Sequence, residues 1–123
     1  METRWLYTTS ENFTALRDAS ADTCIIPMGC VEKHGLHLPL GTDMLQASYI
    51  AYQASQLETV CVFPDFAFGD VPENYPGFFP GSIMLPLETE MLLLEQLGAT
   101  LIGLHDLTTF YDLPKSEENL FDR

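Results

Sequence analysis

The sequence has few basic residues: five lysines and arginines stand against 18 acidic residues, and the formal net charge is −13. Such a charge repels nucleic-acid phosphates and anionic membrane surfaces. No apolar run is long enough to cross a bilayer, and the first residues lack the basic and apolar regions of a signal peptide. We therefore expect a cytoplasmic protein that binds neither nucleic acid nor membrane. Two explanations of the acidic excess stay open: it keeps the protein soluble, or some of the carboxylates bind divalent cations.

Cysteine is also scarce. The three cysteines, Cys24, Cys30 and Cys61, form no C-x-x-C pair. Their odd number and spacing exclude a disulfide framework and a zinc finger, and they agree with a reducing compartment. Cys24 and Cys61 stand inside apolar runs, so we expect them to be small core residues.

Hydrophobic residues make up 46% of the 123 residues, which is enough for one domain with a modest core. Apolar periodicity predicts alternating helices and strands. The predicted helices cover residues 10–19, with Ser10 as N-cap, 43–57 and 86–101, and the predicted strands cover 23–28, 59–63 and 82–85. The first two strands are apolar throughout, as in a parallel sheet covered on both faces. We therefore predict an α/β domain over residues 1–105 and a polar tail at 106–123.

The loop between the first predicted strand and the second helix concentrates chemically active side chains. Glu32 and His34 are two residues apart and so point to the same side of an extended segment. Asp43 stands at a helix start, where backbone N–H groups and the helix dipole hold a carboxylate. Glycines and a proline let the loop turn back, so the three side chains are expected to converge. Glu, His and Asp together suit zinc, manganese or a similar divalent ion.

A plainer interpretation treats Glu32 and His34 as a chance pair and Asp43 as an N-cap. The concentration of histidines, carboxylates and glycines in one loop favours the metal site instead. Cys30 shares the alternation of Glu32 and His34 and could approach a metal, but a half-buried thiol is the simpler expectation. The aromatic segment at 65–80 is expected to line a substrate pocket or an oligomer contact.

Two segments carry a resemblance to a known family. Residues 27–43 (PMGCVEKHGLHLPLGTD) resemble the creatininase-family signature Pro-x-Gly-x-x-Glu-x-His-Gly-x-His-Leu-Pro-Leu-Gly-Thr-Asp, which follows the first strand. Residues 75–85 (YPGFFPGSIML) resemble the family's Phe-Pro-Gly-Thr-x-Ser-Leu segment. The two segments occur in the family's order and together cover most of residues 22–97.

The resemblance implies a truncated three-layer α/β sandwich with a mainly parallel sheet, often assembled as a homo-oligomer. It also implies metal-dependent hydrolysis of a C–N bond in a small-molecule amide or cyclic amide, by an activated water. Carried over by position, Glu32 binds one zinc or manganese ion, His34 binds the other, and Asp43 bridges them. His37 matches a second histidine of the signature and is the implied catalytic residue, facing substrate or standing behind the ligands.

The sequence departs from the family pattern after Leu97. The family's Asn-Gly-His motif, whose histidine is a ligand, and a further glutamate ligand are absent, and the chain ends at Arg123. His105 is the only later histidine, and we expect it to be a helix-end residue. Two functions stay open: a family hydrolase, active alone or after assembly, and a catalytically silent remnant that binds metal weakly or docks onto a complementing chain. A coincidental metal-free α/β module is the third alternative.

Overall fold

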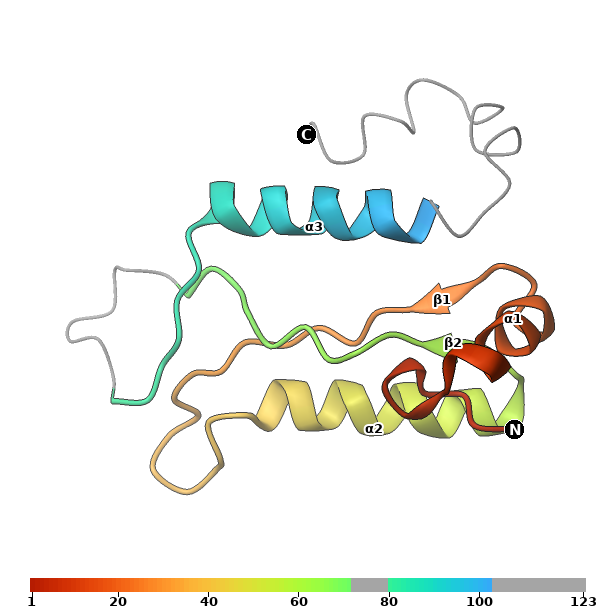
Figure 1. Ribbon diagram of the computed structural model, residues 1–123. Helices are drawn as coiled ribbons and strands as arrows, with labels where there is room; N and C mark the ends of the chain where they lie inside the picture. The colour runs from red at the N-terminus through yellow and green to blue at the C-terminus, as the bar shows by residue number, and fades with distance from the viewer. Residues whose placement is uncertain (72–79, 103–123) are drawn as a thin grey trace. The chain divides into compact units, whose positions relative to one another are not determined.

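A computed structural model of the chain describes residues 1–71 and 80–102 (Figure 1). Contacts within the chain define two compact units, Met1–Met84 and Leu85–Arg123. The first unit contains η1 (Trp5–Tyr7), α1 (Ser10–Ala19), β1 (Cys24–Ile25), α2 (Thr42–Leu57) and β2 (Cys61–Val62), and the second contains α3 (Leu87–Ile102). In the part of the chain that is described, no helix has the length and apolarity needed to cross a membrane.

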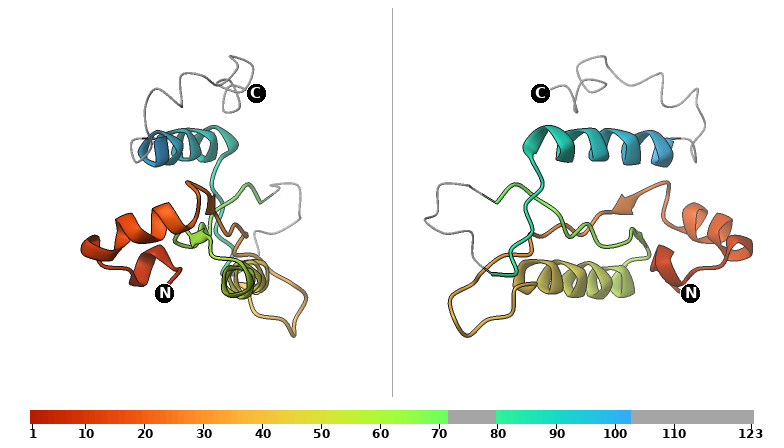
Figure 2. Two further views of the ribbon diagram at one scale, coloured as in Figure 1. Left: turned by 90° about the vertical axis from the view of Figure 1, so that its right-hand side faces the viewer. Right: turned by 60° about the vertical axis from the view of Figure 1, so that its left-hand side comes forward.

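The two strands form a parallel sheet in the first unit. Cys24 lies beside Cys61 and Ile25 beside Val62. The α/β fold with a parallel sheet, predicted from two apolar runs joined by a helix, is therefore confirmed. Figures 1 and 2 show α2 alongside both strands, running in the opposite direction to them.

Backbone pairing continues beyond the short strands. The Phe66 N–H donates to the Pro27 carbonyl at 2.9 Å, and the Gly29 N–H donates to the Phe66 carbonyl at 3.2 Å. β1 ends before the predicted residue 28 because Pro27 has no N–H to donate, and β2 covers only Cys61–Val62 of the predicted 59–63. The irregular pairing still carries the chain to Gly29, so the loop that follows begins at the carboxyl end of the sheet.

Helix α2 packs against β2 through one face. Its buried residues Met44, Ala51 and Ser55 recur at a spacing that places them on the same side of a helix. Ser55 is polar, and its Oγ lies 2.7 Å from the buried Thr3 Oγ1. Thr3 in turn accepts the Val62 N–H at 2.8 Å through its carbonyl. The amino-terminal segment thus joins α2 to the free edge of β2.

Helix α1 begins at Ser10, but Ser10 is not its cap as predicted. Thr9 is the N-cap, and its side chain accepts the Asn12 N–H at 3.3 Å. Thr9 takes the extended backbone that an N-cap requires, whereas Ser10 is already helical. Leu16 is the most deeply buried large side chain of this helix.

The strand predicted at 82–85 is wrong. In the described segment 80–86 no strand forms. The Ile83 N–H instead donates a hydrogen bond of 2.9 Å to the Val31 carbonyl, in the loop between β1 and α2. Helix α3 begins at Leu87, directly after Pro86, and runs to Ile102 close to the predicted bounds. The aromatic positions 72–79, His105 and the tail at 106–123 lie outside the described residues.

Candidate metal centre

The loop between β1 and α2 folds back on itself as a small hairpin. His34 and Leu38 form an antiparallel bridge, and the Glu32 N–H donates to the Leu40 carbonyl at 3.0 Å. The turn between these pairs uses Gly35 at φ 71°, a left-handed conformation that glycine adopts without a steric cost. The hairpin therefore returns the chain to the start of α2 beside the Glu32 backbone.

Gly29 sets how closely the loop approaches α2. A Cβ at this position would lie 2.5 Å from the Met44 backbone nitrogen and 2.7 Å from the Asp43 carbonyl carbon. Real Cβ atoms do not come so near to backbone atoms, so only glycine fits here. From the sequence we expected the loop glycines to provide turns, and we missed this close approach. The sequence signal that could have revealed this close approach is the position of Gly29, directly after a predicted buried strand.

Three side chains meet where the hairpin reaches α2. Ligand atoms of Glu32, His34 and Asp43 all lie within 4.8 Å of one another, and each residue is half-buried. The His34 Nε2 atom lies 3.1 Å from Asp43 Oδ1. The convergence predicted from the sequence is confirmed. The alternative that Asp43 is an N-cap is wrong, because Gly41 caps α2 and Asp43 lies in the first helical turn.

Hydrogen bonding fixes which nitrogen of His34 faces the cluster. Nδ1 lies 2.8 Å from the Glu32 backbone carbonyl. A carbonyl oxygen only accepts, so Nδ1 carries a proton and Nε2 is the nitrogen directed at Asp43. The Glu32 carbonyl, and after it the Asp43 carboxylate, raise the pKa of His34, while partial desolvation opposes them. One ring nitrogen bonded to a backbone carbonyl and the other facing a carboxylate is an arrangement that metal-binding histidines generally have.

His37 and Cys30 lie outside this group of three. His37 is exposed in the hairpin turn, and its ring lies over Gly35, where an added Cβ would be 3.3 Å from Cε1. Cys30 is half-buried, as the simpler expectation had it, and its Sγ fills the space in which a side chain at position 69 would stand. The structure thus brings together the three predicted ligands but not the predicted catalytic histidine.

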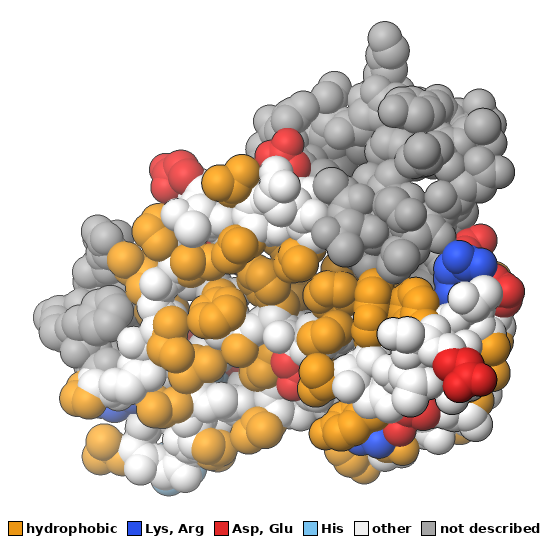
Figure 3. Space-filling model, in the orientation of Figure 1, with side chains coloured by type: hydrophobic (Ala, Val, Ile, Leu, Met, Phe, Trp, Pro, Cys, Tyr) orange, Lys and Arg blue, Asp and Glu red, His pale blue; other side chains and the backbone are white. Residues whose placement is uncertain are grey.

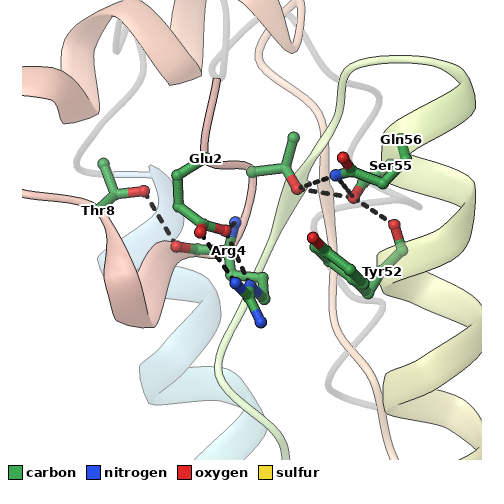
Figure 4. A network of polar contacts seen from close by, with 7 residues as sticks. Glu2, Arg4, Thr8, Tyr52, Ser55 and Gln56 are labelled. Carbon is green, nitrogen blue, oxygen red and sulfur yellow. Dashed lines mark hydrogen bonds and ion pairs between the residues drawn. The ribbon is translucent and has the colours of Figure 1, made fainter.

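A hollow of about 340 Å³ lies beside the amino-terminal segment, and none of the three clustered residues lines it. The guanidinium carbon of Arg4 lies there over the rings of Tyr7 and Tyr52, 4.3 and 4.4 Å from their centroids. Its guanidinium already pairs with Glu2 at 2.8 Å (Figure 4). Because its charge is matched within the chain, this hollow offers no open anion site.

Known proteins share a sequence family and a fold with this chain. A sequence profile of the creatininase family, described as creatinine amidohydrolase, matches residues 7–107. No curated protein is significantly similar to the chain.

Several solved structures share the fold. A crystal structure of creatinine amidohydrolase (creatininase) is 22% identical with a TM-score of 0.73, over 83% of this chain and 40% of that one. A zinc–zinc form of a glutamate-to-glutamine mutant creatininase is 21% identical with a TM-score of 0.75, over 85% and 42%. Manganese creatininase is 20% identical with a TM-score of 0.76, over 85% and 42%. The chain spans about two fifths of the length of these structures. Because the family profile covers most of the sequence, the chain belongs to the creatininase family.

Proposed function

We propose that this chain supplies a Glu–His–Asp site for divalent metal in a metal-dependent amidohydrolase. The substrate would be a small-molecule amide or cyclic amide, cleaved at a C–N bond. Glu32 would bind one ion, His34 the other, and Asp43 would bridge them. The observation that carries this proposal is the convergence of their ligand atoms within 4.8 Å. Related structures are zinc–zinc and manganese forms, which supports zinc or manganese here.

The donor set fits such ions. Two carboxylates and an imidazole are ligands that zinc and manganese accept. Two atoms bound to one ion at about 2.1 Å each are separated by at most about 4.2 Å. The ligand atoms of the three residues lie within 4.8 Å of one another, which is slightly more than this separation. The cluster therefore fits one ion after a small side-chain movement, or two ions that share Asp43.

The protein's own part in the reaction is to hold and orient these groups. The Leu40 carbonyl fixes the Glu32 backbone, the Glu32 carbonyl fixes the His34 ring, and the first turn of α2 favours the Asp43 carboxylate through the helix dipole. Bound divalent ions supply Lewis acidity and lower the pKa of water in sites of this kind. His37 is exposed next to the cluster in sequence, and we assign it the transfer of protons between substrate and solvent.

A catalytically silent protein is the second candidate. The described cluster offers three ligand residues, whereas a closed two-ion site needs more. Under this alternative the chain would bind metal weakly and dock onto a complementing chain or further copies of itself. Under either candidate we expect a cytoplasmic protein.

Calorimetric titration of zinc and manganese, combined with an assay on creatinine and simple formamides, tests both candidates. Glu32→Gln, His34→Ala and Asp43→Asn should each lower metal affinity by at least 10–100-fold, since changes behind the ligands alone typically cost that much. Asp70→Asn is the control, because it removes an exposed carboxylate outside the cluster.

Tight binding with metal-dependent turnover would establish the hydrolase. Weak, site-specific binding without turnover would establish the silent protein. An equal loss of affinity in Asp70→Asn, or no loss in the three cluster variants, would remove the metal site altogether.

A further inference from the structure

Two cysteines lie side by side at the centre of the first unit. Cys24 of β1 and Cys61 of β2 are register partners in the parallel sheet. Register partners on neighbouring strands project their side chains to the same face, and such strands lie about 4.8 Å apart. A disulfide needs Cα atoms about 4.4–6.8 Å apart. The backbone therefore already holds these two residues at bonding separation.

The state of the two side chains suits thiol chemistry. Both are free thiols, with Cys24 half-buried and Cys61 4% exposed. The hydrogen bond from the Cys24 thiol lowers the pKa of Cys61, although burial opposes the effect. The same hydrogen bond, together with burial, raises the pKa of Cys24. Because a thiolate is the reactive form of cysteine, the pair favours Cys61 as the thiolate and Cys24 as the thiol that stabilises it. Cys30 lies elsewhere, against Gly69.

We propose that Cys24 and Cys61 form a reversible dithiol–disulfide pair that is oxidised by low-molecular-weight disulfides of the glutathione type. The Cys61 thiolate attacks one sulfur of the small disulfide and releases the first small thiolate. The Cys24 thiol then loses its proton and attacks the Cys61 sulfur, which releases the second. The two cysteines lose two protons and two electrons, and one small disulfide becomes two small thiols.

The position of the pair gives this bond a consequence for the proposed site. β1 leads through Gly29 into the hairpin that carries Glu32 and His34. A covalent link between β1 and β2 would fix the strand register beneath that hairpin. Oxidation would then restrain the base of the candidate metal centre without using any of its ligands.

The experiment treats the folded protein with oxidised glutathione and follows the intact mass. Lys33 is the first basic residue after Arg17, so tryptic cleavage leaves Cys24 and Cys30 on one peptide. Cys30→Ser removes this ambiguity and keeps the pair. We expect the Cys30→Ser protein to lose two hydrogens without retaining glutathione, and to regain both under a reducing thiol. Adding Cys24→Ser or Cys61→Ser should abolish that loss.

Retention of both thiols in folded Cys30→Ser protein would overturn the proposal. A stable glutathione adduct without a crosslink would do so as well, and so would a crosslink that forms only in denaturant. If Cys30→Ser does not fold, as judged by circular dichroism, fragmentation of the oxidised wild-type peptides decides the question. A Cys24–Cys61 link then supports the pair, and links that involve only Cys30 contradict it.

Discussion

At the scale of single residues, His34 is the centre of the proposed site, because its ring contacts both other members of the cluster. Its Nδ1 atom donates to the Glu32 carbonyl and its Nε2 atom faces Asp43. A proton and a metal ion would compete for Nε2. A proton on Nε2 pairs with the Asp43 carboxylate, whereas a metal ion needs the unprotonated nitrogen. If the proposed function holds, the protonation of this one atom links the stability of the metal-free protein to its affinity for metal.

The first prediction concerns the pH dependence of His34. Its folded-state pKa is raised, so the pairing of protonated His34 stabilises the metal-free protein fully below the ordinary pKa of about 6.5. That stabilisation is lost as the pH rises through the raised pKa, and metal affinity grows over the same range. Asp43→Asn should lower the pKa of His34 only in part, because the Glu32 carbonyl, the larger cause, remains. NMR titration of the His34 ring measures this shift, and Asp70→Asn should leave it unchanged. An unaltered pKa in Asp43→Asn would mean that the two side chains do not interact in solution.

At the scale of elements, the loop and α2 meet through Gly29, which gives the second prediction. Gly29→Ala should destabilise the fold by at least about 1–3 kcal/mol, since the new methyl group meets backbone atoms that cannot rotate away. It should also lower zinc affinity, because the hairpin moves away from Asp43. Gly41→Ala is the matched control: its Cβ meets only Leu45 side-chain atoms at 3.8 Å, and it should cost at most about 1 kcal/mol as an N-cap change. Urea denaturation and calorimetry measure the two effects, and equal losses in both variants would contradict the close-approach argument.

The amino-terminal segment supplies the third prediction, which concerns acid stability. Arg4 hydrogen-bonds to the Glu2 carboxylate and lowers the pKa of Glu2 from 4.5 to about 2 (Figure 4). A lowered folded-state pKa means that the pairing stabilises the protein above the unfolded pKa and is lost as the pH falls through about 2. Glu2→Gln should therefore be less stable than wild type at neutral pH, and the difference should vanish between about pH 5 and pH 2. Because both side chains are partly exposed, added salt should shrink the difference. A gap in unfolding midpoint that stays constant across this range would contradict the pairing.

The same elements show what the sequence could predict. The two apolar runs correctly predicted the parallel strands. The i, i+2 spacing of Glu32 and His34, together with an aspartate at a helix start, correctly predicted that the three side chains converge. Both predictions follow from local periodicity. The strand predicted at 82–85 was wrong, since apolar character alone does not supply a neighbouring strand with which to pair. The contacts between Thr3 and Ser55 and between Gly29 and α2 were not foreseen. These contacts join residues that are far apart in the sequence, and a pattern within a short stretch of sequence does not show which distant residues come together.

At the scale of the whole molecule, two opposing terms govern association. The net charge of −13 makes copies of the chain repel one another. Apolar side chains occupy much of the face in Figure 3, and few basic side chains are seen there. On the face of α2 opposite its buried residues, four large apolar side chains are at least 60% exposed: Leu45, Tyr49, Ile50 and Leu57. Charge thus keeps copies apart, while this face of α2 favours contact between them.

The last prediction is that self-association increases with salt. At low ionic strength the repulsion between chains of charge −13 acts over tens of ångströms, whereas at 0.1 M salt it is screened within about 10 Å. Apolar contact through α2 is not weakened by this screening, so the average mass by sedimentation equilibrium should rise as sodium chloride is added. The double variant Leu45→Ser/Tyr49→Ser should remain smaller than wild type at every salt concentration. Gln53→Ser, an exposed polar change on the same helix, should behave as wild type. A monomer at all salt concentrations would leave docking onto a different chain as the remaining form of assembly. An equal rise in mass for wild type and the double variant would show that the contact lies away from this face of α2.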